Sequence, residues 1–359
     1  MIVFKTYYLS FRYYFFIIFF YFFVLIPVRS QDLFDFNHNG INRQYYLYVP
    51  ESLPVGAPLV FVFHGYGGNA LSIMNYSDMN NMALEHHFAV CYPQGTSDSY
   101  GEQFWNVGYE FHSNETVDDI GFILELSQFL KLQYNVSHNN IFSTGMSNGG
   151  DFSYLLACEA SNIFQAISPV AGTMMTWIYD SCQPIEPLSV FEIHGTDDSI
   201  TLWEGDIDNS EGWGSYMDIA SIIDFWKREN DCQLLLIDTL ENSNTSDGSF
   251  IISETYEDCS YDNQVKLYKI INGGHDWPGA FGNMDINSNE EIWEFFEYNM
   301  QMEIIGDVNF DSLINIQDLL YISDYVINNN TFYFLYDFDN NADLNSNDIV
   351  SIIDYILEY

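Results

Sequence analysis

Basic side chains are scarce in this chain. Of its 359 residues, nine are Lys or Arg and 51 are Asp or Glu, which gives a formal net charge of -42 at pH 7. Nucleic acids and anionic membranes are bound mainly by basic side chains, so this composition argues against both as partners. The acidic excess favours a surface that stays soluble in a salty medium, where ions screen the repulsion between carboxylates.

The N-terminal segment contains an apolar run that is too short to span a membrane. Lys5 and Arg12 form a short basic region, and the apolar run 13–26 follows. This arrangement predicts a signal peptide, residues 1–30, that is cut before Gln31. An uncleaved membrane anchor is the weaker alternative, because a span needs about 20 apolar residues. We therefore expect a secreted protein.

The most informative motif is G-x-S-x-G at residues 145–149. It lies where a predicted strand, 140–144, turns into a helix that is predicted to start near Gly150. In that context Ser147 sits on a sharp, strained turn that exposes its hydroxyl, and the glycines let strand and helix pass closely. The motif alone is weak, since Gly and Ser are common enough to produce it by chance in about one in ten chains of this length.

Two apolar, strand-like runs lead into further motifs of an acyl-transfer site. The run 59–63 ends in the H-G-Y-G-G loop at 64–68, whose backbone N–H groups can approach a reacting carbonyl oxygen. The run 188–193 ends in H-G-T-D-D at 194–198, which places a carboxylate beyond the end of a strand. Catalytic groups gather at this edge of open α/β sheets.

A third run, 265–271, leads into the turn-rich sequence G-G-H-D-W-P-G, in which His275 is the candidate base. The H-G-Y-G-G loop as candidate oxyanion hole, the serine motif, the aspartate and the histidine follow one another in the order found in α/β-hydrolases. This order predicts an α/β fold with a mostly parallel sheet and helices on both faces. His64 and His194 are expected to be structural. Four other histidines are expected to be solvated, namely His86, His87, His112 and His138.

These motifs together resemble the secreted esterases of the polyhydroxybutyrate depolymerase and feruloyl or acetylxylan esterase type, carbohydrate esterase family one. The resemblance covers about residues 44–298. Besides the three loops and the serine motif, it rests on Y-P-Q-G at 92–95, W-N at 105–106, V-D-D-I-G-F at 117–122 and P-V-A-G at 169–172. Asp118 and Asp119 in this set are expected to cap a helix.

The resemblance implies a catalytic triad. Ser147 would be the nucleophile and His275 the general base and acid. Asp198 would orient His275, because the family aspartate is the fifth residue of H-G-T-x-D, and it is therefore preferred to Asp197. The reaction would proceed through an acyl-enzyme.

The resemblance also implies residues around the triad. The backbone N–H groups of Tyr66 and Asn148 would form the oxyanion hole. Trp105 and Trp277 would line the acyl or alcohol pocket. Five cysteines allow two disulfides, and the family places cysteines at both pairs Cys158–Cys182 and Cys232–Cys259. Cys91, in the apolar run 88–92, is then the expected free and buried thiol.

Two acidic loops near the carboxyl end have the spacing of calcium-binding loops. Residues 307–318 and 337–348 both carry oxygen side chains at loop positions one, three, five, nine and twelve. Each loop precedes a helical pattern, 319–327 and 349–357. The candidate ligands are Asp307, Asn309, Asp311, Asn315 and Asp318 in the first loop, and Asp337, Asp339, Asn341, Asn345 and Asp348 in the second.

Such a pair of loop–helix repeats resembles a type I dockerin, which implies two Ca²⁺ ions and a cohesin-type scaffold as partner. Position six is Ser312 or Ala342 where glycine is usual, and a left-handed residue with a side chain costs about 1 kcal/mol. Weaker calcium binding is therefore expected. The partner-reading positions 316–317 and 346–347 differ between the repeats, which disfavours a symmetric dual binding mode. An acidic tail without metal is the alternative.

The predicted organisation is a signal peptide (1–30), an esterase domain (31–300) and a small all-α dockerin-like domain (301–359). No long linker separates the last two, so they are expected to pack together. The predicted function is a secreted serine esterase that removes feruloyl or acetyl groups from xylan. The alternatives are a polyhydroxyalkanoate depolymerase, a peptidase of the same fold and a non-catalytic scaffold-docking protein.

Overall fold

The computed structural model describes residues 33–309, 313–328 and 332–358. The predicted signal peptide, its cleavage point before Gln31, Ser312 and the candidate ligand Asp311 lie outside the described residues. Among the described residues, no helix is long and apolar enough to cross a bilayer.

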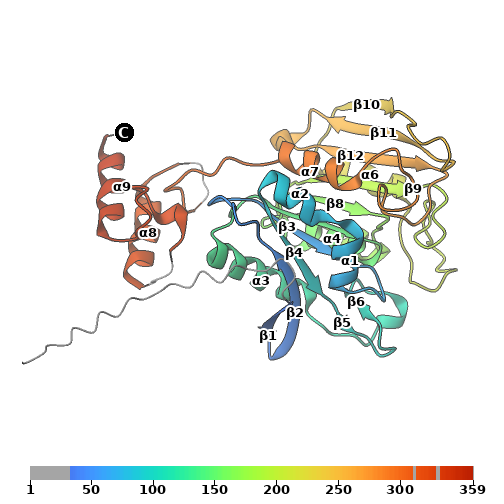
Figure 1. The fold of residues 1–359 in the computed structure, drawn as a ribbon, viewed down its shortest axis with the longest axis horizontal. Helices are drawn as coiled ribbons and strands as arrows, with labels where there is room; N and C mark the ends of the chain where they lie inside the picture. Colours follow the sequence, from blue (N-terminus) through green and yellow to red (C-terminus); the bar gives the residue numbers. More distant parts are fainter. Residues whose placement is uncertain (1–32, 310–312, 329–331, 359) are drawn as a thin grey trace, which may run out of the picture.

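A ten-stranded sheet forms the centre of the larger part of the molecule (Figure 1), with the order β1-β2-β4-β3-β7-β8-β9-β12-β11-β10. The six strands from β4 to β12 in this order run parallel, and antiparallel strands complete both edges. The bounds are β1 Leu33–His38, β2 Ile41–Tyr48, β3 Leu59–Phe63, β4 Ala89–Gln94, β7 Ile141–Met146, β8 Ala166–Val170, β9 Ser189–Gly195, β10 Leu234–Thr239, β11 Phe250–Glu257 and β12 Val265–Ile271. A separate two-stranded ribbon joins β5 Thr96–Ser97 to β6 Gln103–Phe104.

Helices cover both faces of this sheet, as the α/β prediction requires. All five residues of β3 are buried, which is why this strand is a continuous apolar run. Its alternate side chains enter two cores, Phe61 and Phe63 on one face and Val60 and Val62 on the other. The first core takes its helical residues from α3 (Asp119–Tyr134), α4 (Asn148–Glu159), α5 (Thr176–Ser181) and α6 (Ile219–Glu229). The second takes them from α1 (Ala70–Ser77), α2 (Met79–His86) and α7 (Ser288–Tyr298).

The V-D-D segment has a structural role at the start of α3. Asp118 is the N-cap, and its side chain accepts a hydrogen bond from the Gly121 amide at 2.8 Å. Asp119 is fully buried and forms a 2.7 Å ion pair with Arg43 of β2. Its other oxygen accepts from the Asn106 amide at 2.8 Å. The expected cap is therefore confirmed for Asp118, whereas Asp119 ties three segments together.

Both expected disulfides are present. Cys158 of α4 is bonded to Cys182 after α5, and Cys232 before β10 is bonded to Cys259 after β11. Cys91 in β4 is free and buried, and its burial raises the pKa of the thiol. A neutral, inaccessible thiol has no part in the chemistry.

The C-terminal segment contains α8 (Ile316–Asn328), the short 3-10 helix η3 (Phe334–Tyr336) and α9 (Ser346–Glu358). A small apolar cluster joins them, with Ile322 and Ile352 fully buried. Leu132 of α3 packs against this cluster. The carboxylate of Glu303 accepts hydrogen bonds from the Ser137 hydroxyl (2.6 Å) and from two backbone amides just before β7. The segment therefore packs on the larger part, as the short connection predicted.

Candidate active site

Ser147 lies on a strained turn between β7 and α4. Its backbone has φ +57° and ψ -125°, values that a residue with a side chain rarely adopts. A Cβ on Gly149 would lie 2.3 Å from the Phe63 carbonyl oxygen, and a Cβ on Gly145 would lie 2.7 Å from the backbone of Gly149. Both flanking glycines are thus required by close backbone packing. The turn is fixed by the Ser147 amide, which donates to the Val170 carbonyl at 2.9 Å.

The glycine loop after β3 lies directly beside this serine, because a Cβ on Gly65 would be 3.3 Å from the Ser147 Cβ. His64 holds the loop. Its Nδ1 donates to the Gly65 carbonyl (2.8 Å) and its Nε2 accepts from the Gly95 amide (3.0 Å). Burial lowers the pKa of His64 to about 4, which keeps the ring in the neutral form that this pair of bonds needs. His64 is therefore structural, as expected.

Two backbone donors remain available at this point. Among the residues that the structure describes, the amides of Tyr66 and Asn148 donate to no protein acceptor. The Asn148 side chain pairs with the backbone of Trp105, accepting from its N–H at 2.7 Å and donating to its carbonyl at 3.0 Å. The Asn148 amide, at the start of α4, also has the positive end of the helix behind it. The arrangement can hold a negative oxygen.

Tyr66 is anchored by a buried acid. Its hydroxyl donates to Asp98 at 2.8 Å, and His112 lies 3.0 Å from the same carboxylate oxygen. Although burial opposes ionisation, the hydrogen bonds from His112 and Tyr66 lower the pKa of Asp98 to about 2. The expectation of a solvated His112 is therefore wrong, because the excursion after β4 folds back over its ring and leaves it 2% exposed.

The triad candidates Asp198 and His275 are in direct contact. His275 Nδ1 lies 2.7 Å from Asp198 Oδ2. Asp198 follows β9 with a fully buried side chain, and its other oxygen accepts from the amides of Ile200 (2.8 Å) and Thr201 (2.9 Å). Asp197 is exposed. Burial and a complete donor set distinguish Asp198 from its neighbour.

A small cavity, partly open to solvent, lies beside Ser147. Ile200 and Thr201, whose amides hold Asp198, form part of its wall, so the cavity connects the serine to the loop of the acid. The other lining residues are Tyr109, Asp151, Thr173, Met175, Trp213 and Tyr216. The wall thus combines aromatic and aliphatic side chains with hydroxyl groups and one acid.

Asp151 is the polar group in this wall. It lies one helical turn after Ser147, and its oxygens accept from the Tyr109 hydroxyl (2.6 Å) and the Thr173 amide (2.7 Å). Burial raises its pKa to about 7. Its spacing of four residues from Ser147 on a predicted helix was the one sequence signal that could have identified it.

Trp105 and Trp277 do not line the cavity, which corrects the expected substrate contacts. Their side chains are 0% and 1% exposed. Trp105 stacks on Phe152 with ring centroids 5.0 Å apart, and the Trp277 indole N–H donates to Asn289 at 3.2 Å. Trp213 takes the expected place in the wall. It lies in a long irregular segment, where no periodic pattern or motif predicts its role.

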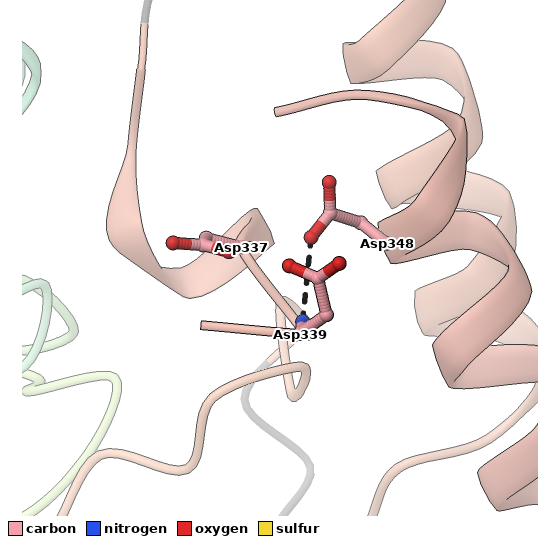
Figure 2. Close-up of side chains that lie close together, drawn as sticks. All are labelled: Asp337, Asp339 and Asp348. Atoms are coloured by element: carbon pink, nitrogen blue, oxygen red, sulfur yellow. Dashed lines mark hydrogen bonds between the residues drawn. The ribbon is translucent and has the colours of Figure 1, made fainter. Parts of the chain in front are cut away.

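Three acids of the second C-terminal loop gather in front of α9 (Figure 2). Asp337, Asp339 and Asp348 each place one oxygen within 4.8 Å of the others. Asp348 accepts from the amides of Asp339 (3.4 Å) and Asn345 (2.8 Å). Within the described part of the chain, Asp339 Oδ1 is buried without a donor. Loss of solvent and the charge of Asp348 raise the pKa of Asp339. An oxygen-only set with an unsatisfied carboxylate fits Ca²⁺.

The first C-terminal loop repeats part of this pattern. Asp318 accepts from the amides of Val308 (2.9 Å), Asn309 (3.2 Å) and Asn315 (2.9 Å). Asp318 and Asp348 therefore close their loops in the same way, at position twelve. In the second loop, Ala342 has φ +63°, the left-handed conformation expected at position six.

The sheet order, the strained serine and the Asp–His pair define a carboxylic ester hydrolase of the α/β-hydrolase class. The chain belongs to the esterase PHB depolymerase family, whose model matches residues 43–224. Among solved structures, it is similar to an acetyl xylan esterase from Aspergillus awamori, with TM-score 0.51 and 15% identity over 74% of this chain and 99% of that one. This likeness supports the fold.

Curated relatives have related activities. The chain is 26% identical to feruloyl esterase C of Emericella nidulans over 72% of this chain and 86% of that protein. It is 21% identical to a bifunctional acetylxylan esterase/xylanase of Neocallimastix patriciarum, and 23% identical to poly(3-hydroxyalkanoate) depolymerase C of Paucimonas lemoignei. Each match covers 71% of this chain but only 33% and 65%, respectively, of the other protein.

Proposed function

We propose that the protein is a secreted serine esterase that removes feruloyl or acetyl groups from plant-type polysaccharide. The observation that carries this proposal is the 2.7 Å contact between Asp198 and His275, in a fold that exposes Ser147 on a strained turn. The cavity beside the serine and the two available amides supply the remaining parts of an acyl-transfer site.

The proposed reaction has two steps. His275 directs Nδ1 at Asp198, so Nε2 takes the proton as the Ser147 hydroxyl attacks the ester carbonyl. The amides of Tyr66 and Asn148 stabilise the oxyanion. His275 returns the proton to the leaving alcohol, which leaves an acyl group on Ser147. Water, activated by the same histidine, then releases the acid.

Aromatic side chains around the cavity favour an acyl group with a flat or small shape. Trp213 and Tyr109 line the cavity, and their rings meet edge to face with centroids 5.3 Å apart. Feruloyl and acetyl activities appear in the names of two relatives. A hydroxyalkanoate polyester is the second candidate, because the matching family is that of PHB depolymerases.

A panel of methyl ferulate, acetylated xylan and polyhydroxybutyrate tests the substrate. Release of ferulate or acetate without release of hydroxybutyrate supports the polysaccharide esterase. Hydrolysis of polyhydroxybutyrate alone would favour the depolymerase over the polysaccharide esterase. Hydrolysis of none of the three esters would reject both functions. Cleavage of an aminoacyl anilide in place of the esters would indicate a peptidase.

For the C-terminal segment we propose two bound Ca²⁺ ions and a cohesin-type scaffold. Residues 307–318 and 337–348, including Asp311, would supply the ligands, and the ion would neutralise the crowded carboxylates of each loop. A surface for a partner is available on α8 and α9, where large apolar side chains are exposed: Ile316, Leu320, Tyr321, Ile327, Val350 and Leu357. Capture of the full-length chain by immobilised cohesin in Ca²⁺, and its release by chelator, tests this proposal. No capture in Ca²⁺ would remove the scaffold partner.

A further inference from the structure

A second histidine lies behind the triad acid. His194, at the end of β9, has a fully buried side chain, and its Nε2 lies 3.6 Å from Asp198 Oδ2. The same nitrogen lies 2.9 Å from the Thr201 carbonyl. On the other side of the ring, Nδ1 lies 2.9 Å from the carboxylate of Glu192. Asp198 is therefore placed between two imidazoles, those of His194 and His275.

The surroundings of His194 favour its charged form. Both ring nitrogens face oxygens that accept hydrogen bonds, so a neutral ring beside an ionised Glu192 would direct a lone pair at one of them. Burial raises the pKa of Glu192, and the hydrogen bonds from His194, the Tyr154 hydroxyl (2.9 Å) and the Gly172 amide (3.3 Å) act against that rise and support its ionised form. Burial opposes the charge on His194, but the hydrogen bond and charge of Glu192, together with the charge of Asp198, raise its pKa.

We propose that His194 is a positioning residue, held as an imidazolium between Glu192 and Asp198, and that it weakens the hold of Asp198 on the proton of His275. The proposal rests on the proposed triad. Opposite charge close to an acid reduces the field of that acid at its other neighbour. With His194 charged, His275 remains a free base at lower pH, which extends esterase activity into mildly acidic medium.

Other charged groups face this cluster and must be held constant. Asp151 interacts with both Glu192 and His194, and Asp276 interacts with His275. Lys269 is paired with His194 in the β12–β9 register, but its ammonium lies over the ring of Trp203, 4.7 Å from the centroid. None of these three groups is changed in the variants below.

The test is the pH profile of kcat/KM on 4-nitrophenyl acetate for the full-length protein. His194→Gln and Glu192→Gln both remove the imidazolium, the second by removing the anion that holds it. In each, the ratio of kcat/KM at pH 6 to that at pH 8 is expected to fall about three- to tenfold, as the acidic limb moves to higher pH. Tyr154→Phe removes one of the hydrogen bonds to Glu192 without changing a charged group, so it should change the ratio less than either charge variant.

A uniform loss of activity with an unchanged ratio in both charge variants would overturn the proposal and leave a structural role only. A shift of equal size in Tyr154→Phe would also overturn it. If the charge variants do not fold, histidine-selective ¹⁵N spectra of the wild type decide, because His194 should keep both nitrogens protonated at pH 8 and a neutral ring would refute it. If Ser147→Ala were as active an esterase as the wild type, the proposed triad itself would be rejected instead.

Discussion

The two sites of this molecule use aspartates in opposite ways. Asp198 in the esterase part has protein donors on both oxygens, from His275 on one and from two amides on the other. Asp339 in the C-terminal segment has a buried oxygen without a donor in the described residues, and two other acids lie close to it. Protein atoms alone satisfy Asp198, whereas in our proposal a cation would complete the second site.

This difference follows from the size of the supporting core. The turn at Ser147 is held by a large sheet with a core on each face, which can maintain a strained backbone. The C-terminal cluster has few buried apolar side chains, and small modules of this kind generally need a metal or disulfide for stability. Catalysis should therefore be insensitive to calcium, and the C-terminal fold should depend on it.

The largest expected effect is on the esterase site. Ser147→Ala should lower kcat/KM on 4-nitrophenyl acetate about a thousandfold or more, because the proposed acyl-enzyme forms on the Ser147 hydroxyl. Ser153→Ala, in the same helix but outside the cavity lining, is the matched control and should stay within about threefold of wild type. Activity of Ser147→Ala within about tenfold of wild type would show that Ser147 is not the nucleophile.

The next effect separates two adjacent acids. Asp198→Asn should cost about a thousandfold in kcat, since an amide can no longer hold the imidazolium that forms on His275. Asp197→Asn should cost less than about threefold, because this side chain is exposed. Kinetics of both variants at pH 8 are the measurement, and the reverse order would shift the triad acid by one residue.

Calcium should act on the second site alone. Removal of the ion leaves the repulsion among Asp337, Asp339 and Asp348 uncompensated, so the amides of α9 should exchange hydrogen about tenfold faster or more in chelator than in Ca²⁺. Hydrogen exchange by mass spectrometry of the full-length chain measures this. Esterase activity should be equal in both conditions. Equal hydrogen exchange of α9 in Ca²⁺ and in chelator would contradict the proposed calcium site. Loss of esterase activity in chelator would contradict the independence of the catalytic site from calcium.

The smallest effect concerns Asp151. Its pKa is raised from 3.8 to about 7 by burial, so the folded state keeps a proton that the unfolded chain loses above about pH 4. Its contribution to the free energy of unfolding is therefore full below pH 4 and is lost as the pH rises to about 7. Asn does not titrate, so the Tm of Asp151→Asn minus that of wild type should increase from pH 4.5 to pH 7.5 by several degrees. A constant difference would contradict this burial effect.

The sequence predicted the parts of the fold that are most constrained. The bounds of β3 and β12 agree with the predicted runs to the residue, because strands inside a covered parallel sheet need continuous apolar sequence. β7 was predicted to end at residue 144 and ends at Met146, and α8 begins at Ile316, three residues before its predicted start. Element ends depend on local hydrogen bonds that apolar patterns do not report.

The cavity wall could not be predicted in the same way. Trp213, Tyr109 and Thr173 come from irregular segments that are far apart in the chain, and only the folded sheet brings them together beside Ser147. Trp105 belongs to the W-N motif of the family and Trp277 follows His275 by two residues, but their rings point into the two cores. Proximity to a motif along the chain does not determine which side of a loop faces the substrate.

The central claim is that the fold alone activates Ser147. Labelling the full-length protein with a fluorophosphonate, in chelator, and mapping the modified peptide by mass spectrometry tests it most directly. The account predicts one labelled peptide, with the label on Ser147, a parallel loss of esterase activity, and no label in Ser147→Ala. A label on another serine, or full esterase activity in protein that does not react, would contradict it.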